Sequence, residues 1–182
     1  ADGSVTAYSD QCPMGTGTQT SLSQIVSDEL GIDYRDVAFR FGDTESAPFG
    51  LGSWGSRAMV IAGSAAYQAA RRLRERLLDI AAYQLSVAVE DLDLAEGAVY
   101  VRDDPERRRT LAELAKDAHF NGHALPDDMT AGPLLVTESF DNPAPGPLDD
   151  SGRSDPAVNY PSGVHALVVD VDTRTGLVEI LD

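Results

Sequence analysis

Two glycine-rich loops carry most of the residues that could bind a ligand. The first, MGTGTQT at residues 14–20, sets two glycines among three threonines, and the second, GDTESAPFGLGSWGSR at residues 42–57, ends in a serine and an arginine. Glycine lets a backbone approach a ligand closely, while hydroxyl groups donate and accept hydrogen bonds. Helix-forming sequence follows each loop, so backbone N–H groups and the positive end of a helix dipole would face the ligand. This chemistry favours an anionic or strongly hydrogen-bonding ligand.

The same inventory excludes several familiar ligands. Lys116 is the only lysine and follows neither loop, which excludes the phosphate-binding P-loop. The first loop also lacks the third glycine of a dinucleotide fingerprint. With 14 Lys+Arg against 30 Asp+Glu, the chain carries a net charge of −16 and should repel nucleic acid. A G-x-S-x-G nucleophile elbow is absent from the sequence, which counts against a serine hydrolase.

Cysteine and histidine are too few for a convincing metal centre. Cys12 is the only cysteine, so it cannot hold an iron–sulfur cluster by itself, and it suits a reducing, cytoplasmic compartment. His119 and His123 have the spacing of helical zinc ligands, but an Asn-Gly pair between them should end the helix and no third ligand is evident. His165 lies in an apolar segment and is interpreted as a core or edge residue. We therefore expect no metal site made by side chains.

Three further features have a structural and a functional interpretation. Trp54, the only tryptophan, would either stack on a planar ligand or be buried under the helix that follows. The run Arg107 to Arg109 follows a proline and is interpreted as a solvated turn. Three carboxylates are candidates for a general base by residue type alone: Glu29, Glu45 and Glu138. We interpret them as solvated side chains and assign none of them catalysis.

Hydrophobic periodicity predicts the elements that must position the two loops. Strands are predicted at 4–9, 37–41, 98–101 and 134–140, and helices at 21–30, 55–85 and 110–118. Ser21 and Gln24 have capping-box spacing, and Gly31 sits where a helix-ending glycine belongs. The alanine and glycine in the first half of the long helix would allow a neighbouring backbone to approach closely. A hairpin is predicted from 164–172 and 177–181 around TRTG.

These elements mix without strict alternation, so we predict an α+β fold of two layers, with a mixed sheet and two main helices. We expect one domain over residues 1–182, with the Pro/Gly/Asp-rich stretch 141–163 as a surface loop. No apolar run approaches the roughly 20 residues of a membrane span, and we expect a soluble protein. Because the sequence begins at Ala1 and stops at Asp182 directly after a strand, we also expect it to be part of a longer polypeptide.

Taken in tandem, the two loops resemble those of a known family. The motifs G-x-G-x-x-T and GDT…P-x-G-x-G…GSR, followed by an alanine-rich helix, resemble the molybdopterin-binding large subunit of the molybdenum hydroxylases. That superfamily includes xanthine dehydrogenase, aldehyde oxidase and aerobic carbon monoxide dehydrogenase. The stretch NYPSGVHALVVDVDTRTGLVEI, residues 159–180, also resembles a strand and hairpin of those subunits.

The resemblance implies a fold like that of a molybdenum-cofactor-binding domain and a role for each loop. It places the cofactor-binding residues at Gly15, Thr16, Gly17 and Thr20 in the first loop and at Ser53, Trp54, Gly55, Ser56 and Arg57 in the second. The chain departs from the family pattern at two positions. Thr16 stands where many members have glutamine, and Ala58 stands where serine is frequent, so the side-chain contacts at these positions should differ.

The resemblance also implies cofactors and partners. These are molybdopterin with molybdenum, expected in the cytosine dinucleotide form of bacterial branches, and iron–sulfur clusters and FAD on partner subunits or domains. The implied activity of the full subunit is hydroxylation of an aldehyde, an N-heterocycle or purine, or a CO-type substrate with water-derived oxygen. The family's general base is a glutamate in another segment, so we assign no catalytic residue here and expect the fragment alone to be inactive. Apolar surface should be exposed where the rest of the large subunit is missing, and a homo-oligomer could cover it.

Two functions of other classes are also compatible with the residues. In one, the chain is a non-catalytic acidic α+β module for binding or assembly, and the glycine loops are only turns. In the other, it is a nucleotide-binding domain in which the helix N-termini hold phosphate.

Overall fold

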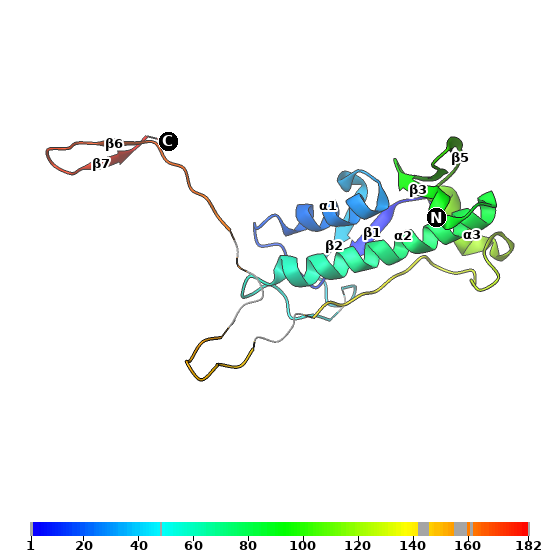
Figure 1. The fold of residues 1–182 in the computed structure, drawn as a ribbon, viewed down its shortest axis with the longest axis horizontal. Coiled ribbons are helices and arrows are strands. Elements are labelled where there is room, and N and C mark those ends of the chain that lie inside the picture. Colours follow the sequence, from blue (N-terminus) through cyan, green and yellow to red (C-terminus); the bar gives the residue numbers. More distant parts are fainter. Residues whose placement is uncertain (1, 48, 142–145, 155–159, 161, 182) are drawn as a thin grey trace. The chain divides into compact units, whose positions relative to one another are not determined.

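The computed structural model describes residues 2–47, 49–141, 146–154, 160 and 162–181, which fall into two units, Ala1–Ala144 and Pro145–Asp182. Among the described residues, the first unit contains three α-helices and five strands (Figure 1). Its strands are β1 (Val5–Tyr8), β2 (Val37–Arg40), β3 (Leu92–Ala95), β4 (Ala98–Val101) and β5 (Asp104–Thr110). Its α-helices are α1 (Thr18–Leu30), α2 (Ser64–Leu85) and α3 (Leu111–Phe120). The predicted α+β class is confirmed.

The strands form small separate sheets. β1 and β2 pair in parallel, with Val5 opposite Val37, and α1 connects them. β3, β4 and β5 form an antiparallel sheet in that order. Parallel and antiparallel pairing are therefore mixed between sheets rather than within one.

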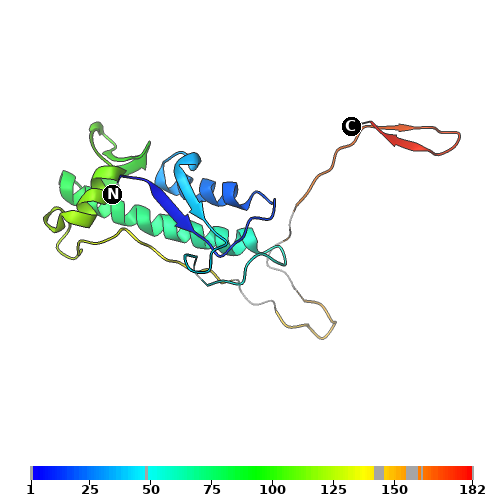
Figure 2. The same ribbon diagram turned by 180° about the vertical axis from the view of Figure 1, so that it is seen from behind.

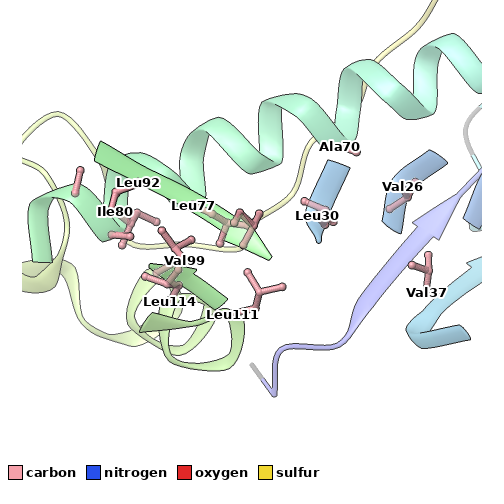
Figure 3. Close-up of a cluster of buried hydrophobic side chains, with 14 of the residues drawn as sticks. Val26, Leu30, Val37, Ala70, Leu77, Ile80, Leu92, Val99, Leu111 and Leu114 are labelled. Atoms are coloured by element: carbon pink, nitrogen blue, oxygen red, sulfur yellow. The ribbon is translucent and has the colours of Figure 1, made fainter. Parts of the chain in front are cut away.

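Helix α2 is the element on which α1, α3 and the three-stranded sheet pack, while β2 lies against α1. The buried face of α2, which includes Leu77 and Ile80, gathers with Leu92 of β3, Val99 of β4 and Leu114 of α3 (Figure 3). Next to this cluster, α1 lies beside α2 and contributes side chains such as Val26 and Leu30 to the same core (Figures 1 and 3). Burial of these apolar side chains is the main force that holds the helices together.

Helix α1 begins earlier than predicted. The capping box at Ser21 and Gln24 is wrong, because Gly17 is the N-cap residue and the helix starts at Thr18. Ser21 lies inside the first turn, where its hydroxyl donates to the Gly17 carbonyl over 3.2 Å. The predicted end is confirmed, since Gly31 is the left-handed C-cap with φ 57°.

The long helix predicted over 55–85 starts at η2 (Met59–Gly63), a π-helical turn that continues into α2. A Cβ at Gly63 would lie 3.3 Å from Ile25 Cδ1 and from Met59 Sδ. The small residues at the head of this helix therefore allow α1 to approach closely, as predicted.

The predicted strand at 134–140 is wrong. This stretch is extended but pairs with no described strand, and α2 side chains hold it instead. Arg76 donates to the Leu135 carbonyl over 3.1 Å, and Arg72 pairs with Glu138 at 2.9 Å. Alternate residues are half-buried as they would be on a strand, which explains why the sequence pattern resembled one.

The interpretation of Arg107 to Arg109 as a solvated turn is wrong about the turn, although Arg107 and Arg108 are exposed. These residues lie on β5, which the sequence pattern did not predict, at the edge of the three-stranded sheet. Arg107 donates to the Leu85 carbonyl, while Arg109 donates to Gln84 and to Asp117. The run therefore ties β5 to the end of α2 and to α3.

Helix α3 starts at the capping box of Thr110 and Glu113, and it ends at the Asn-Gly pair as expected. The described residues of the first unit also form three short 3₁₀ turns, η1 (Tyr34–Asp36), η3 (Val89–Asp91) and η4 (Gly122–Ala124). None of the described helices is long and apolar enough to pass through a bilayer.

The second unit consists, in its described part, of a turn near Asp149 and a hairpin of β6 (Val169–Val171) and β7 (Val178–Ile180). The predicted hairpin around TRTG is confirmed. Its apolar side chains are exposed, and so is His165, which contradicts the core or edge interpretation of that histidine. The predicted surface loop 141–163 lies partly outside the described residues, and its described part is exposed. That both units form one domain stays a prediction.

Candidate functional site

The two glycine loops lie at the same end of the first unit because α1 and α2 run in the same direction. Ile25, in the middle of α1, approaches Gly63 at the head of α2, and farther along both helices, Arg74 of α2 reaches the Glu29 carbonyl in the last turn of α1 over 3.0 Å. Figures 1 and 2 show the first turns of both helices at one end, seen from opposite sides. The loops that enter these helices therefore open at the same end.

The first loop presents open backbone and exposed hydroxyls. Gly15 and Gly17 have φ values of 83° and 70°, and a Cβ at either position would meet nothing within 4 Å. Thr16 and Thr20 are exposed, and the Thr16 hydroxyl lies 2.8 Å from that of Thr18. Because the N-cap residue is glycine, no side chain caps the first N–H groups of α1. A ligand could therefore approach these donors without displacing protein atoms.

The second loop ends in a tight turn that displays the tryptophan. Gly55 and Ser56 have φ values of 58° and 59°, and Arg57 N donates to the Trp54 carbonyl over 3.3 Å. Two consecutive positive φ values closed by this hydrogen bond are typical of a type I′ turn. A left-handed serine costs about 1 kcal/mol, and such strain is often found at functional sites.

Trp54 is exposed rather than buried under the helix, with 64% of its surface accessible. The Arg57 guanidinium carbon lies 5.5 Å from its ring centroid, within the range of a cation–π interaction. The same guanidinium donates to the Gly52 carbonyl over 3.1 Å. The turn thus displays an aromatic face beside the only cation in either loop.

Asp10 and Gln11, which precede the first loop, join it to the second. Gln11 is 1% exposed and donates from Nε2 to the Gly52 carbonyl over 3.3 Å. Its Oε1 accepts from the Ser53 hydroxyl at 2.6 Å, and Gly52 N donates to the Asp10 carboxylate at 3.2 Å. Sequence reasoning missed both residues, because nothing in the local pattern shows that a polar pair before the loop becomes buried against residues more than 40 positions away.

Of the nine predicted site residues, the structure therefore puts four on one loop and five on another at the same end of two parallel helices. Exposed hydroxyls, open glycine backbone, uncapped helix N–H groups, one indole face and one guanidinium suit a large planar ligand that also carries anionic groups. The described residues include no cluster of three or more His, Cys, Asp or Glu side chains placed to hold a metal ion.

Other parts of the described chain are weaker candidates for a binding or catalytic site. Two shallow acidic hollows share Ile32, Asp36 and Gly97, close to the end of α1 that is opposite the loops. Of the three carboxylates considered as general bases, Glu45 is exposed and Glu29 is half-buried. Glu138 is occupied by its ion pair with Arg72 and is therefore not a free solvated side chain.

Comparison with known proteins gives a consistent result. The model of the molybdopterin cofactor-binding domain matches residues 1–182. The carbon monoxide dehydrogenase large chain of Hydrogenophaga pseudoflava is 34% identical over 174 residues, which are 96% of this chain and 20% of that protein. The nicotine 6-hydroxylase large subunit of Paenarthrobacter nicotinovorans is 32% identical over 178 residues, which are 98% of this chain and 20% of that protein.

A solved structure agrees with the sequence matches. Quinoline 2-oxidoreductase from Pseudomonas putida 86 aligns with a TM-score of 0.74 and 28% identity over 100% of this chain and 21% of that one. The chain spans about one fifth of the length of these relatives. Together, the match along the whole sequence and the shared fold show that the chain belongs to the molybdopterin cofactor-binding domain family of the molybdenum hydroxylases.

Proposed function

We propose that the two loops hold one molybdopterin cofactor between them. The contacts are proposed at Gly15, Thr16, Gly17 and Thr20 of the first loop and at Ser53, Trp54, Gly55, Ser56 and Arg57 of the second. One observation carries this proposal: α1 and α2 run in the same direction, so both loops open at the same end, where Gln11 joins them. Loops that faced opposite ends could not share a ligand.

Each group in the site has a definite task in this proposal. The uncapped N–H groups at the head of α1 hydrogen-bond to polar atoms of the cofactor, and the helix dipole favours its negative charge. The open backbone at Gly15 and Gly17 lets the ligand come within hydrogen-bonding distance. Trp54 offers an aromatic face and Arg57 a positive charge for a phosphate.

By the resemblance to the family, Thr16 stands where many members have the longer glutamine. Its hydroxyl hydrogen-bonds to Thr18, so it is held at the loop rather than extended toward a ligand. We propose that Thr16 contacts the cofactor through its backbone or through a bridging water. The metal is held through the cofactor and not by side chains of this chain.

We further propose that the chain is one part of a longer molybdenum-binding subunit of an oxidoreductase. The names of its relatives support oxidation of a small molecule: carbon monoxide dehydrogenase, nicotine 6-hydroxylase and quinoline 2-oxidoreductase. The proposed substrate is an aldehyde, an N-heterocycle or purine, or a CO-type molecule. The bound cofactor supplies two-electron redox chemistry, while the residues of this chain bind and orient it and the catalytic base comes from another segment.

Partners follow from the same relatives, two of which are named as a large chain and a large subunit. We propose iron–sulfur and FAD subunits or domains as partners, a cytoplasmic location, and the cytosine dinucleotide form of the cofactor. Exposed apolar side chains on the β6–β7 hairpin, such as Val178 and Ile180, support burial against other parts of such a subunit.

A matched pair of glycine substitutions tests the proposal. Gly17 and Gly152 both have a left-handed backbone and open space around a Cβ, with φ values of 70° and 72°. Asparagine tolerates this conformation, so Gly17→Asn and Gly152→Asn add the same bulk at similar backbone cost. In Gly17→Asn the new side chain also competes for the N–H groups of α1.

The measurement is molybdenum and pterin content per mole of purified full-length subunit. We expect cofactor content to fall in Gly17→Asn and to match the unmodified protein in Gly152→Asn. Equal cofactor content in both variants would show that the first loop does not hold the cofactor.

A further inference from the structure

The polar pair Asp10 and Gln11 has contacts that the proposed cofactor contacts do not explain. Gln11 is almost completely buried although glutamine is usually exposed in proteins. Burying an amide is unfavourable unless its groups are hydrogen-bonded. Here the Nε2 group reaches both oxygens of Asp10 at 2.9 Å as well as the Gly52 carbonyl. The amide is therefore satisfied by groups of the two segments that it joins.

These hydrogen bonds converge on one short piece of the second loop. Gln11 holds the Gly52 carbonyl and accepts from Ser53, while Asp10 holds the Gly52 N–H. Both backbone polar groups of Gly52 are thus bound by side chains from the segment that leads into the first loop. A Cβ at Gly50 would collide with the Asp10 carboxylate, so the Asp10 side chain lies directly against the backbone of the second loop.

The same carbonyl connects the pair to the displayed side chains. Gly52 O accepts from Gln11 and from the Arg57 guanidinium, and that guanidinium lies over the Trp54 ring. A shift of Gly52 would therefore move Arg57 and with it the turn that carries Trp54.

We propose that Asp10 and Gln11 are positioning residues. They hold Gly52 and Ser53 against the start of the first loop and thereby fix Trp54 and Arg57 in the orientation in which they meet the cofactor. The cofactor part of this inference rests on the proposed function. The positioning part stands on the hydrogen bonds alone and can be tested without cofactor.

Trp54 provides a local probe, because it is the only tryptophan of the chain. Its fluorescence anisotropy in the 182-residue chain reports the mobility of the second loop together with the tumbling of the whole chain, and the tumbling is common to all variants of this length. Gln11→Met keeps the length of the side chain and suits a buried site, but it removes the side-chain hydrogen bonds to Gly52 and Ser53. Gln24→Met makes the same change at an exposed position of α1 and is the matched control.

We expect lower Trp54 anisotropy in Gln11→Met than in the unmodified chain, with unchanged far-UV circular dichroism, and no change in Gln24→Met. Asp10→Ala removes the hydrogen bond that the Gly52 N–H donates, at a position that is less buried than Gln11. We expect it to lower the Trp54 anisotropy as well. Unchanged anisotropy in both Gln11→Met and Asp10→Ala would overturn the positioning role.

The cofactor part is tested on the full-length subunit by molybdenum and pterin content. We expect less bound cofactor in Gln11→Met and normal content in Gln24→Met. Normal content in Gln11→Met together with lowered anisotropy would overturn the link to the cofactor. If the unmodified subunit contains no pterin, the proposed function fails, whereas the anisotropy result still decides whether the pair positions the loop.

Discussion

Arg74 should contribute far more to stability than its neighbour Arg71, although both are arginines on α2. The Arg74 guanidinium donates to the Glu29 carbonyl in the last turn of α1 and to the Asp93 carboxylate of β3, over 3.0 and 2.7 Å. Arg71 instead pairs with Glu75 along its own helix at 3.4 Å, with 60% of its side chain exposed. One residue joins three elements, and the other joins none.

The expected loss of stability in each variant follows from how exposed the arginine and its partners are. Hydrogen bonds to charged groups contribute about 1.5–3 kcal/mol when buried. The Arg74 and Asp93 side chains are 25% and 37% exposed, so solvent screening reduces their ion pair. The positive charge near the C-terminal carbonyls of α1 adds a few tenths of a kcal/mol. We therefore expect Arg74→Met to cost about 2 kcal/mol and Arg71→Met less than about 0.5 kcal/mol.

Methionine is chosen because it keeps most of the apolar stem and removes only the guanidinium. The assay is denaturant unfolding followed by circular dichroism, supported by the midpoint of thermal unfolding. For a chain of this size, 2 kcal/mol corresponds to a decrease of about 4–8 °C. Equal losses in the two variants would refute the argument that Arg74 holds α1, α2 and β3 together.

Three further predictions concern single positions. Leu114→Ala should cost about 2–5 kcal/mol in denaturant unfolding, because Leu114 is fully buried; a loss under about 1 kcal/mol would contradict the observed packing. Gly31→Ala should lower the free energy of unfolding by at least about 2 kcal/mol, and Gly97→Ala by about 1 kcal/mol. Both glycines have positive φ, but only at Gly31 would a Cβ lie 2.7 Å from the β3 backbone. Equal losses in the two variants would refute this difference. Hydrogen bonds from the backbone and side chain of Thr110 lower the pKa of Glu113. The ionised Glu113 therefore stabilises the fold at pH values above the ordinary pKa of glutamate. This stabilisation is lost as the pH falls through the lowered pKa. Glu113→Gln should therefore lower the free energy of unfolding by about 0.5–1 kcal/mol at pH 7, and the difference between the two proteins should shrink in acid. A difference that stayed constant in a pH series of unfolding curves would contradict the assignment.

Local signals were sufficient for several elements. Gly31 predicted the end of α1 because a left-handed residue is needed there, and glycine adopts that conformation without strain. The hairpin around TRTG followed from two apolar runs separated by turn residues. The motifs of both glycine loops were enough to identify the family, and their positions at two helix N-termini were predicted from the periodicity that follows each loop.

Other elements depend on partners that a local pattern does not reveal. β5 contains Pro105 and three arginines, a composition that is poor for a strand, yet it forms because β4 offers a pairing edge and the proline lies on an edge strand. The stretch 134–140 shows the reverse case. Its residues alternate in burial as on a strand, but α2 lies against it and no described strand pairs with it. The burial of Gln11 likewise arises from contact with Gly52 and Ser53 and has no local signature.

The central claim is that both glycine loops contact one cofactor, and an experimental structure of the cofactor-loaded, full-length subunit measures this directly. We predict one molybdopterin in contact with the backbone at Gly15 to Gly17 and also with the turn from Trp54 to Arg57. A cofactor that touched only one of these loops, or that lay away from the helix N-termini, would contradict the account.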